Sequence, residues 1–229
     1  MPIEPWFPLA VYYEDLADAA EHKPALVAAA RACRDEQPKR NADNKAAWTG
    51  DIHGIQRLHD DPRFAWLTAR VEEHTTRYLA ALGYQLDQLS LHFQRSWPVI
   101  AGAGEWVAKH RHAASHVSAV YWVQSPAASG ALTFPEDDPR NECAPGVQMH
   151  DDQVVRPNPL SYGTTSYQPV EGRLVLFPSK TPHSVSPEDI EGQRISISYD
   201  IVLTAREDAA HPSYEFLMPS PATWRAFGQ

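Results

Sequence analysis

Long apolar runs are missing from this sequence, and cysteine is rare. A transmembrane helix needs about 18 or more consecutive apolar residues, so we expect no membrane partner. The first residues, Met-Pro-Ile-Glu-Pro-Trp, lack the basic start and the apolar core of a secretory signal, and we expect a cytoplasmic protein. The two cysteines, Cys33 and Cys143, are too few for a disulfide framework, so we expect both to be reduced and structural.

Basic charge is scarce as well. The 229 residues carry a formal net charge of −9, and the strongest basic cluster is only Lys39 and Arg40. Proteins that bind nucleic acid need basic surface against the phosphates, so we expect no nucleic-acid partner. A chain of this length with 43% hydrophobic residues can bury a sizeable core.

Histidine, in contrast, is abundant, with eleven in the chain. His110 and His112 are one residue apart, and on a strand such residues point to the same face because side chains alternate. His183, which follows Pro182, can meet them only if the fold brings a distant strand alongside. A β-barrel holds a metal in this way, so we interpret the three histidines as metal ligands. His116 follows four residues after His112, and we interpret it as a pocket residue or a solvated one.

Arg194 and Ser196 form a second pattern downstream of the third histidine. On a strand they share a face with Ser198, and a core strand would not bury such a polar stripe without a ligand to satisfy it. A guanidinium offers a charge-assisted fork that suits a small carboxylate. A metal site with a carboxylate anchor suggests an iron and 2-oxoglutarate site.

The first part of the chain is predicted to be mainly helical. Alanine-rich residues from Pro24 to Asp35 have apolar positions at helical spacing, and a clearer helix is expected from Asp61-Pro62, an N-cap with proline in the first turn, to Gly83. An opening strand is expected from Phe7 to Tyr13, and a short helix near Pro221 to Phe227.

From Leu86 the apolar period changes to that of strands, with turn residues between short segments. Many short strands in one acidic domain favour a sandwich or jelly roll. The stretch from Pro135 to Tyr162 is rich in Pro, Asp and Asn, and we expect a long loop that closes over the site. The strands are expected at Leu89 to Ser96, Trp106 to His110, Val117 to Gln124, Ala131 to Phe134, Thr165 to Gln168, Arg173 to Phe177 and Arg194 to Leu203.

A set of short motifs now occurs in a recognisable order. Together they resemble the bacterial and phage group of iron(II)- and 2-oxoglutarate-dependent oxygenases with a double-stranded β-helix core. The resemblance extends upstream through Trp48-Thr49-Gly50 and the helix near Phe64, so it covers most of the chain. The motifs are Ser96-Trp97, His110-x-His112, Ser118 to Val123, Ser129 to Phe134, Leu176 to Ser179, Pro182-His183 and Arg194 to Ser198.

The resemblance implies a mainly β fold with flanking helices, in which a jelly-roll, cupin-like barrel holds Fe(II). It also implies that 2-oxoglutarate chelates the iron, that its far carboxylate binds Arg194 and Ser196, and that O2 takes the remaining position. Such an enzyme hydroxylates a small molecule or an amino-acid or peptide substrate and releases succinate and CO2. The hydroxyl of Tyr121 is a further candidate contact to the co-substrate, although packing is the default for an aromatic residue on a core strand. We assign no catalytic residue beyond the metal ligands.

The third metal ligand is where this chain departs from the better-known members of the wider superfamily. They use His-x-Asp or His-x-Glu with a distal histidine, and this chain has His112 where the carboxylate would be. Either His112 binds in its place, or Asp151 or Asp152 enters from the long loop. We favour His112, because a loop ligand loses more conformational entropy on ordering than a ligand fixed by a strand.

The residues are expected to form one oxygenase domain over 1–229. Its parts are a largely helical support (1–85), the jelly-roll core (86–204) and a C-terminal extension (205–229). Two other functions stay open: a three-histidine, cupin-type dioxygenase that does not use 2-oxoglutarate, and a non-catalytic metal-binding jelly-roll module. The sequence names neither the substrate nor the type of oxidation, and it leaves a homodimer open.

Overall fold

The computed structural model describes residues 2–4, 6–37, 45–135, 141, 143, 158, 160–161, 163–206 and 216–228. These ranges contain the three predicted helices and all the predicted strands. Most of the long loop between Pro135 and Tyr162, with Asp151 and Asp152, lies outside them. The expectation that this loop closes over the site therefore stays a prediction.

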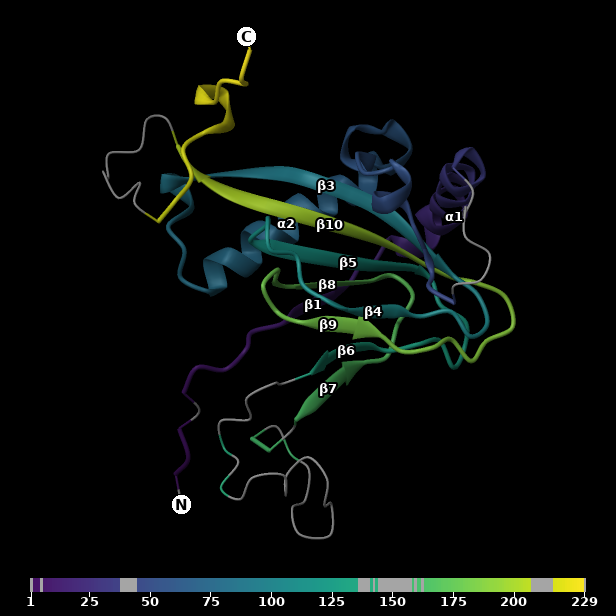
Figure 1. Cartoon of the computed structure of the whole chain (residues 1–229). Helices are drawn as coiled ribbons and strands as arrows, with labels where there is room; N and C mark the ends of the chain where they lie inside the picture. Colours follow the sequence, from purple (N-terminus) through teal and green to yellow (C-terminus); the bar gives the residue numbers. More distant parts are fainter. Residues whose placement is uncertain are drawn as a thin grey trace.

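Two antiparallel sheets form the core of the protein (Figure 1). The major sheet has, in spatial order, β1 (Tyr12–Asp15), β8 (Arg173–Pro178), β5 (Val117–Gln124), β10 (Arg194–Ala205), β3 (Leu89–Ala101) and β2 (Trp48–Thr49). The minor sheet has β4 (Val107–His110), β9 (His183–Val185), β6 (Leu132–Pro135) and β7 (Thr164–Tyr167). The fold is mainly β with flanking helices, as the sequence predicts.

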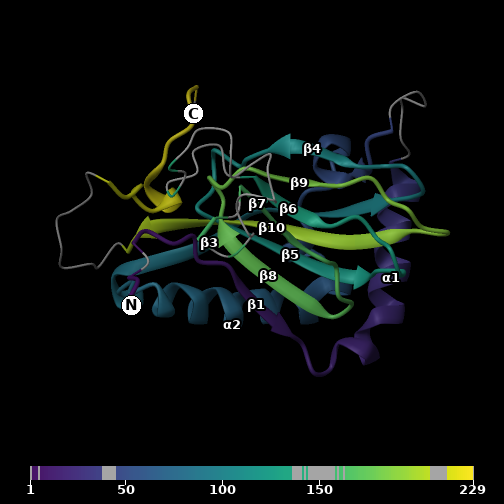
Figure 2. The same ribbon diagram turned by 90° about the horizontal axis from the view of Figure 1, so that it is seen from below.

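Two α-helices cover one face of the major sheet, on the side away from β4 and β9 (Figure 2). They are α1 (Ala19–Glu36) and α2 (Ala65–Ala81), and five 3-10 helices accompany them: η1 (Gly50–His53), η2 (Leu58–Asp60), η3 (Pro62–Phe64), η4 (Leu86–Gln88) and η5 (Pro221–Thr223). The described part of the chain contains no helix that is both long and apolar enough to cross a membrane.

The start and stop signals of the second helix act as the sequence predicts. The Asp61 carboxylate accepts the backbone N–H of Arg63, and Pro62 opens the first turn, which is a 3-10 turn that leads into α2. At the other end Gly83 has a φ of +86°, a left-handed conformation that glycine adopts without steric cost. The predicted C-terminal helix is shorter than expected, because only the 3-10 turn η5 forms there.

Alternation along β5 and β10 decides which side chains reach the space between the sheets. Odd-numbered residues of both strands, such as Val117 and Ile195, belong to the apolar core under the helices. Even-numbered residues point the other way, and Trp122 packs with Phe134 of β6 in a second, smaller core between the sheets. Arg194, with its even number, therefore lies on the face of β10 that is turned toward the minor sheet.

Candidate metal centre

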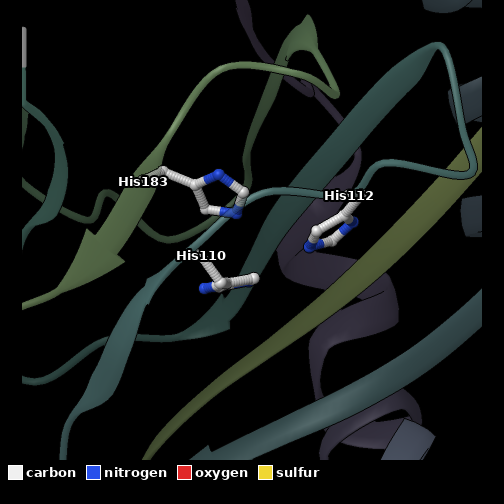
Figure 3. Close-up of side chains that lie close together, drawn as sticks. All are labelled: His110, His112 and His183. Atoms are coloured by element: carbon white, nitrogen blue, oxygen red, sulfur yellow. The ribbon is translucent and has the colours of Figure 1, made fainter. Parts of the chain in front are cut away.

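The three predicted histidines meet at one end of the minor sheet (Figure 3). His110 ends β4, His183 begins β9, and the two residues are paired across this antiparallel ladder. His112 comes two residues after the end of β4. One ligand nitrogen from each histidine lies within 4.8 Å of the others. The ladder between β4 and β9 is what brings residues so far apart in sequence together.

Hydrogen bonds select the nitrogen that each ring can offer to a metal. Nδ1 of His110 lies 2.7 Å from the carbonyl oxygen of Ala108, and Nδ1 of His183 lies 2.9 Å from that of Thr181. Nδ1 of His112 is bonded to Oδ1 of Asp200. Carbonyl and carboxylate oxygens only accept hydrogen bonds, so each Nδ1 carries the proton and donates it. Each Nε2 then keeps a free lone pair, which is the requirement for binding a metal.

His112 is held in a different way from the one that the sequence predicts. The expectation was two histidines on one strand, but β4 ends at His110, so for His112 this expectation is wrong. Its backbone N–H donates to the carbonyl of Ser179 at 3.0 Å, and the N–H of Ser179 donates to the carbonyl of His116. These bonds fix the segment after β4 against the end of β8, so His112 is ordered without belonging to a strand.

Aromatic rings surround the three histidines. The ring of Trp97 lies 5.5 Å from that of His112, and Phe177 meets His183 edge to face at 4.9 Å between centroids. Burial, followed by the nearby His110 and His112 rings, lowers the pKa of His183 to about 4. His183 is therefore neutral near pH 7, and a metal can bind it without first displacing a proton.

This low pKa predicts a pH dependence for the metal-free protein. His183 titrates near 6.5 when unfolded and near 4 when folded, so between these values the unfolded chain binds more protons. The free energy of unfolding should be highest above pH 6.5 and should fall by about 3 kcal/mol as the pH drops toward 4. Urea unfolding of metal-free protein across this range measures the slope. His183→Gln should flatten it, and an equal slope in that variant would contradict the assignment.

Asp200 is the residue of this centre that the sequence analysis missed. It is completely buried, and it lies between Arg95 of β3 and Ser118 of β5 as their cross-strand partner. Burial alone would raise the pKa of Asp200, but the hydrogen bond from His112 and the charge of Arg95 outweigh it and hold this pKa below its usual value. The polar stripe of Arg194, Ser196 and Ser198 continues to position 200, which was the signal that could have revealed it.

Arg194 and Ser196 face the space between the sheets, and Arg194 is only 1% exposed. Nε of Arg194 donates to the carboxylate of Glu188, and Nη1 donates to Oγ of Ser196 at 3.1 Å. Nη2 is also buried, and no partner for it occurs in the described part of the chain. A buried donor without an acceptor is costly, and a carboxylate oxygen of a ligand would satisfy it.

Tyr121 does not join these residues. It is an odd-numbered residue of β5, and its ring packs under the helices against Trp66, 6.0 Å between centroids. Arg194 and Ser196 lie on the opposite face of the same sheet. The prediction that the Tyr121 hydroxyl contacts the co-substrate does not agree with this position, and packing against the helices accounts for the ring.

The remaining predicted residues have simpler positions. Nδ1 of His116 accepts the backbone N–H of Leu203 at 2.8 Å, so it supports the loop after His112 and does not join the three histidines. Cys33 is buried and Cys143 is exposed, and both are free thiols. A structural, packed role therefore fits Cys33 alone.

Comparison with known families identifies the domain. A family model described as "Putative 2OG-Fe(II) oxygenase" matches residues 95–200, which hold all three histidines together with Arg194 and Ser196. Residues 95–200, which make up most of the jelly-roll core, thus match a 2OG-Fe(II) oxygenase domain. No curated protein matches the sequence.

Solved structures share the fold at low sequence identity. A prolyl-4-hydroxylase from Pseudomonas putida is 16% identical with a TM-score of 0.54, over 85% of this chain and 92% of that one. The nogalamycin-biosynthesis carbocyclase SnoK, which is α-ketoglutarate-dependent, is 11% identical with a TM-score of 0.59, over 92% and 87%. HygX from Streptomyces hygroscopicus, solved with nickel and 2-oxoglutarate, is 9% identical with a TM-score of 0.52, over 85% and 82%.

Proposed function

We propose that this protein is a non-haem iron(II)- and 2-oxoglutarate-dependent dioxygenase in which His110, His112 and His183 bind the iron. In the same proposal, Arg194 and Ser196 bind the distal carboxylate of 2-oxoglutarate. The observation that carries it is the unpartnered, buried Nη2 of Arg194, on the same face of β10 as the residue that bonds His112. Arg194, Ser196 and the Asp200 that bonds His112 thus lie on one face of β10.

The donor set fits iron(II). His110, His112 and His183 would hold the iron through three imidazole nitrogens, and this would leave it able to bind co-substrate and dioxygen as well. Within the described residues no fourth His, Cys, Asp or Glu joins this group. A structural metal site is normally closed by a fourth protein ligand, so the open face favours catalysis over a binding module.

The anion site fits 2-oxoglutarate. Oγ of Ser196 accepts from Arg194, so its own proton remains available to donate to a carboxylate. Glu188 holds Nε of Arg194 and turns the Nη1 and Nη2 end of the guanidinium away from itself. Oε2 of Glu188 in turn accepts the backbone N–H of Gly130 at 2.7 Å. The cation is therefore fixed in place before any ligand binds.

The role of the chain in the reaction is to bind, orient and exclude water. Bound iron(II), together with 2-oxoglutarate and dioxygen, supplies the oxidising chemistry. The Nδ1 bonds of His110 and His183 hold their rings with Nε2 free for the metal, and Trp97 and Phe177 pack against the rings of His112 and His183. Exclusion of water protects a reactive centre from side reactions.

For the substrate we propose a small molecule or an amino-acid or peptide side chain, which is hydroxylated with release of succinate and CO2. Structural relatives support this range: a prolyl hydroxylase from Trichoplax adhaerens was solved with a peptide fragment, and SnoK is a carbocyclase of antibiotic biosynthesis. We also propose a single domain over the chain, because the apolar core under the helices takes residues from α1, α2 and the strands alike.

The cupin-type alternative uses three histidines and no 2-oxoglutarate. It accounts for His112. It offers no acceptor, however, for the buried Nη2 of Arg194, which has no partner in the described part of the chain. The Arg194 site therefore favours the 2-oxoglutarate enzyme.

Anaerobic titration of the iron(II) protein with 2-oxoglutarate tests the proposal. We expect a visible metal-to-ligand charge-transfer band, because the keto acid would chelate the iron, and we expect succinate when oxygen is admitted, even without the true substrate. Protein loaded with zinc in place of iron is the control and should show neither. Iron that binds while 2-oxoglutarate changes no spectrum and yields no succinate would support the cupin-type alternative.

A further inference from the structure

The carboxylate of Asp200 is buried and hydrogen-bonded to His112, the residue at the position where the better-known oxygenases have a carboxylate ligand. The side chain of Asp200 is 0% exposed, and its Oδ1 accepts Nδ1–H of His112. We propose that Asp200 is the positioning residue that aims Nε2 of His112 at the iron and supplies, from behind that ligand, the negative charge that a histidine lacks. The inference rests on the proposed function, since it requires that His112 binds the metal.

The contacts of Asp200 suit this role because they fix it from both neighbouring strands, β3 and β5. Oδ2 accepts Nη2 of Arg95 at 2.5 Å, and Oγ of Ser118 donates to Oδ1 at 3.2 Å. Ser118 also bonds Oγ of Ser179 at 2.9 Å, and the carbonyl of Ser179 accepts the backbone N–H of His112. One connected network thus holds both the ring and the main chain of His112.

The charge of the network also fits. Three neutral imidazoles leave a metal one charge more positive than two imidazoles and a carboxylate would. Arg95 offsets part of the charge of Asp200, but Asp51 lies 3.7 Å from the same guanidinium. Two carboxylates therefore face one guanidinium, and a net negative charge remains behind His112. A carboxylate bonded to a histidine ligand makes that ligand more basic and fixes its orientation.

A purely structural ion pair would be arranged differently. Arg and Asp side chains that serve only each other favour a fork in which both carboxylate oxygens bind the guanidinium. Here only Oδ2 binds Arg95, while Oδ1 is turned to His112 and Ser118. Arg95 is moreover about a third exposed and has Asp51 as a second partner, so it does not depend on Asp200 to stay solvated.

A double-mutant cycle on the full-length apoprotein tests the role, with Co(II) as the probe and a competing chelator as the readout. Asp200→Asn keeps the size of the side chain and removes its charge. We expect it to weaken Co(II) binding by about 10- to 100-fold in the wild-type background. In a His112→Ala background, Asp200→Asn should weaken Co(II) binding by less than about threefold, because Asp200 acts on the metal only through its hydrogen bond to His112. Ser118→Ala, which removes a neutral member of the same network, is the matched control and should cost much less than Asp200→Asn.

Several outcomes would overturn the inference and can be told apart. Equal losses in both backgrounds would make Asp200 a merely structural residue, and no loss in either would remove it from the metal centre. If wild-type protein binds no Co(II), or if His110→Ala and His183→Ala bind it normally, the proposed function fails instead. Should Asp200→Asn not fold, Asp200→Asn with Arg95→Gln removes both charges together and takes its place in the cycle. Imidazole 15N NMR of the wild type adds a test without substitution, because His112 must carry its proton on Nδ1.

Discussion

His110→Ala will fold like the wild type and will bind iron(II) at least about 100-fold more weakly, because removing a ligand should cost more than the 10- to 100-fold typical of residues behind the ligands. His110 is the most exposed of the three histidines, whereas His112 and His183 are buried. Its removal therefore takes away coordination with little packing, which makes it the cleanest of the three substitutions.

Iron content after anaerobic loading and thermal unfolding of the metal-free proteins measure the two parts of this prediction. His22→Ala is the matched control, because His22 of α1 stacks on Trp66 of α2 and does not belong to the group of three histidines. His112→Ala should lose iron as His110→Ala does. Normal iron in His112→Ala, with loss in Asp151→Ala or Asp152→Ala, would assign the third ligand to the loop.

Arg194→Lys will weaken the binding of 2-oxoglutarate while iron binding stays intact. Lysine keeps the charge, but its ammonium lacks the planar, fixed fork with which a guanidinium binds both oxygens of a carboxylate. Arg194→Ala removes the counter-charge of a buried carboxylate and should weaken binding by about 2 to 5 kcal/mol. It also leaves Glu188 buried and unpaired, so Arg194→Ala should unfold more easily as well. Arg194→Lys keeps a positive charge beside Glu188, and for this reason it is the more informative of the two variants.

The charge-transfer band, titrated under anaerobic conditions, measures this affinity separately from turnover. Arg173→Lys is a suitable control, because Arg173 makes a comparable pair with Asp15 on the surface. Wild-type affinity in Arg194→Lys and Arg194→Ala alike would show that the distal carboxylate binds elsewhere.

The meeting of the histidines and the orientation of Arg194 and Ser196 could be predicted largely because strand geometry is regular. Alternation placed Arg194 and Ser196 on one face of β10, and the pairing of β4 with β9 set His110 opposite His183. The predicted end of the strand at His110 is also confirmed. What alternation cannot give is how His112 is held beyond that end, because this depends on the bond from its backbone N–H to the Ser179 carbonyl.

Tyr121 shows a second limit. Central strands of the major sheet are covered on both faces, by the helices and by the minor sheet, so β5 has apolar residues at odd and even positions alike. The sequence of such a strand does not reveal which face points into the barrel. For Asp200 the difficulty is different, because its role depends on a contact with His112 across 88 positions of sequence.

A strand at His183 was expected because the three histidines have to meet, but its bounds were not predicted, since the three residues of β9 give too little alternation to read. It nevertheless carries the distal histidine.

The placement of His112 gives a bound ion a mechanical part to play. His110 and His183 belong to the minor sheet, whereas His112 is tied through Ser179 and Asp200 to β8 and β10 of the major sheet. An ion held by all three would join the two sheets at one end of the barrel. Both cysteines of the chain are free thiols, so no disulfide links the two sheets. A bound iron would then be the cross-link between them.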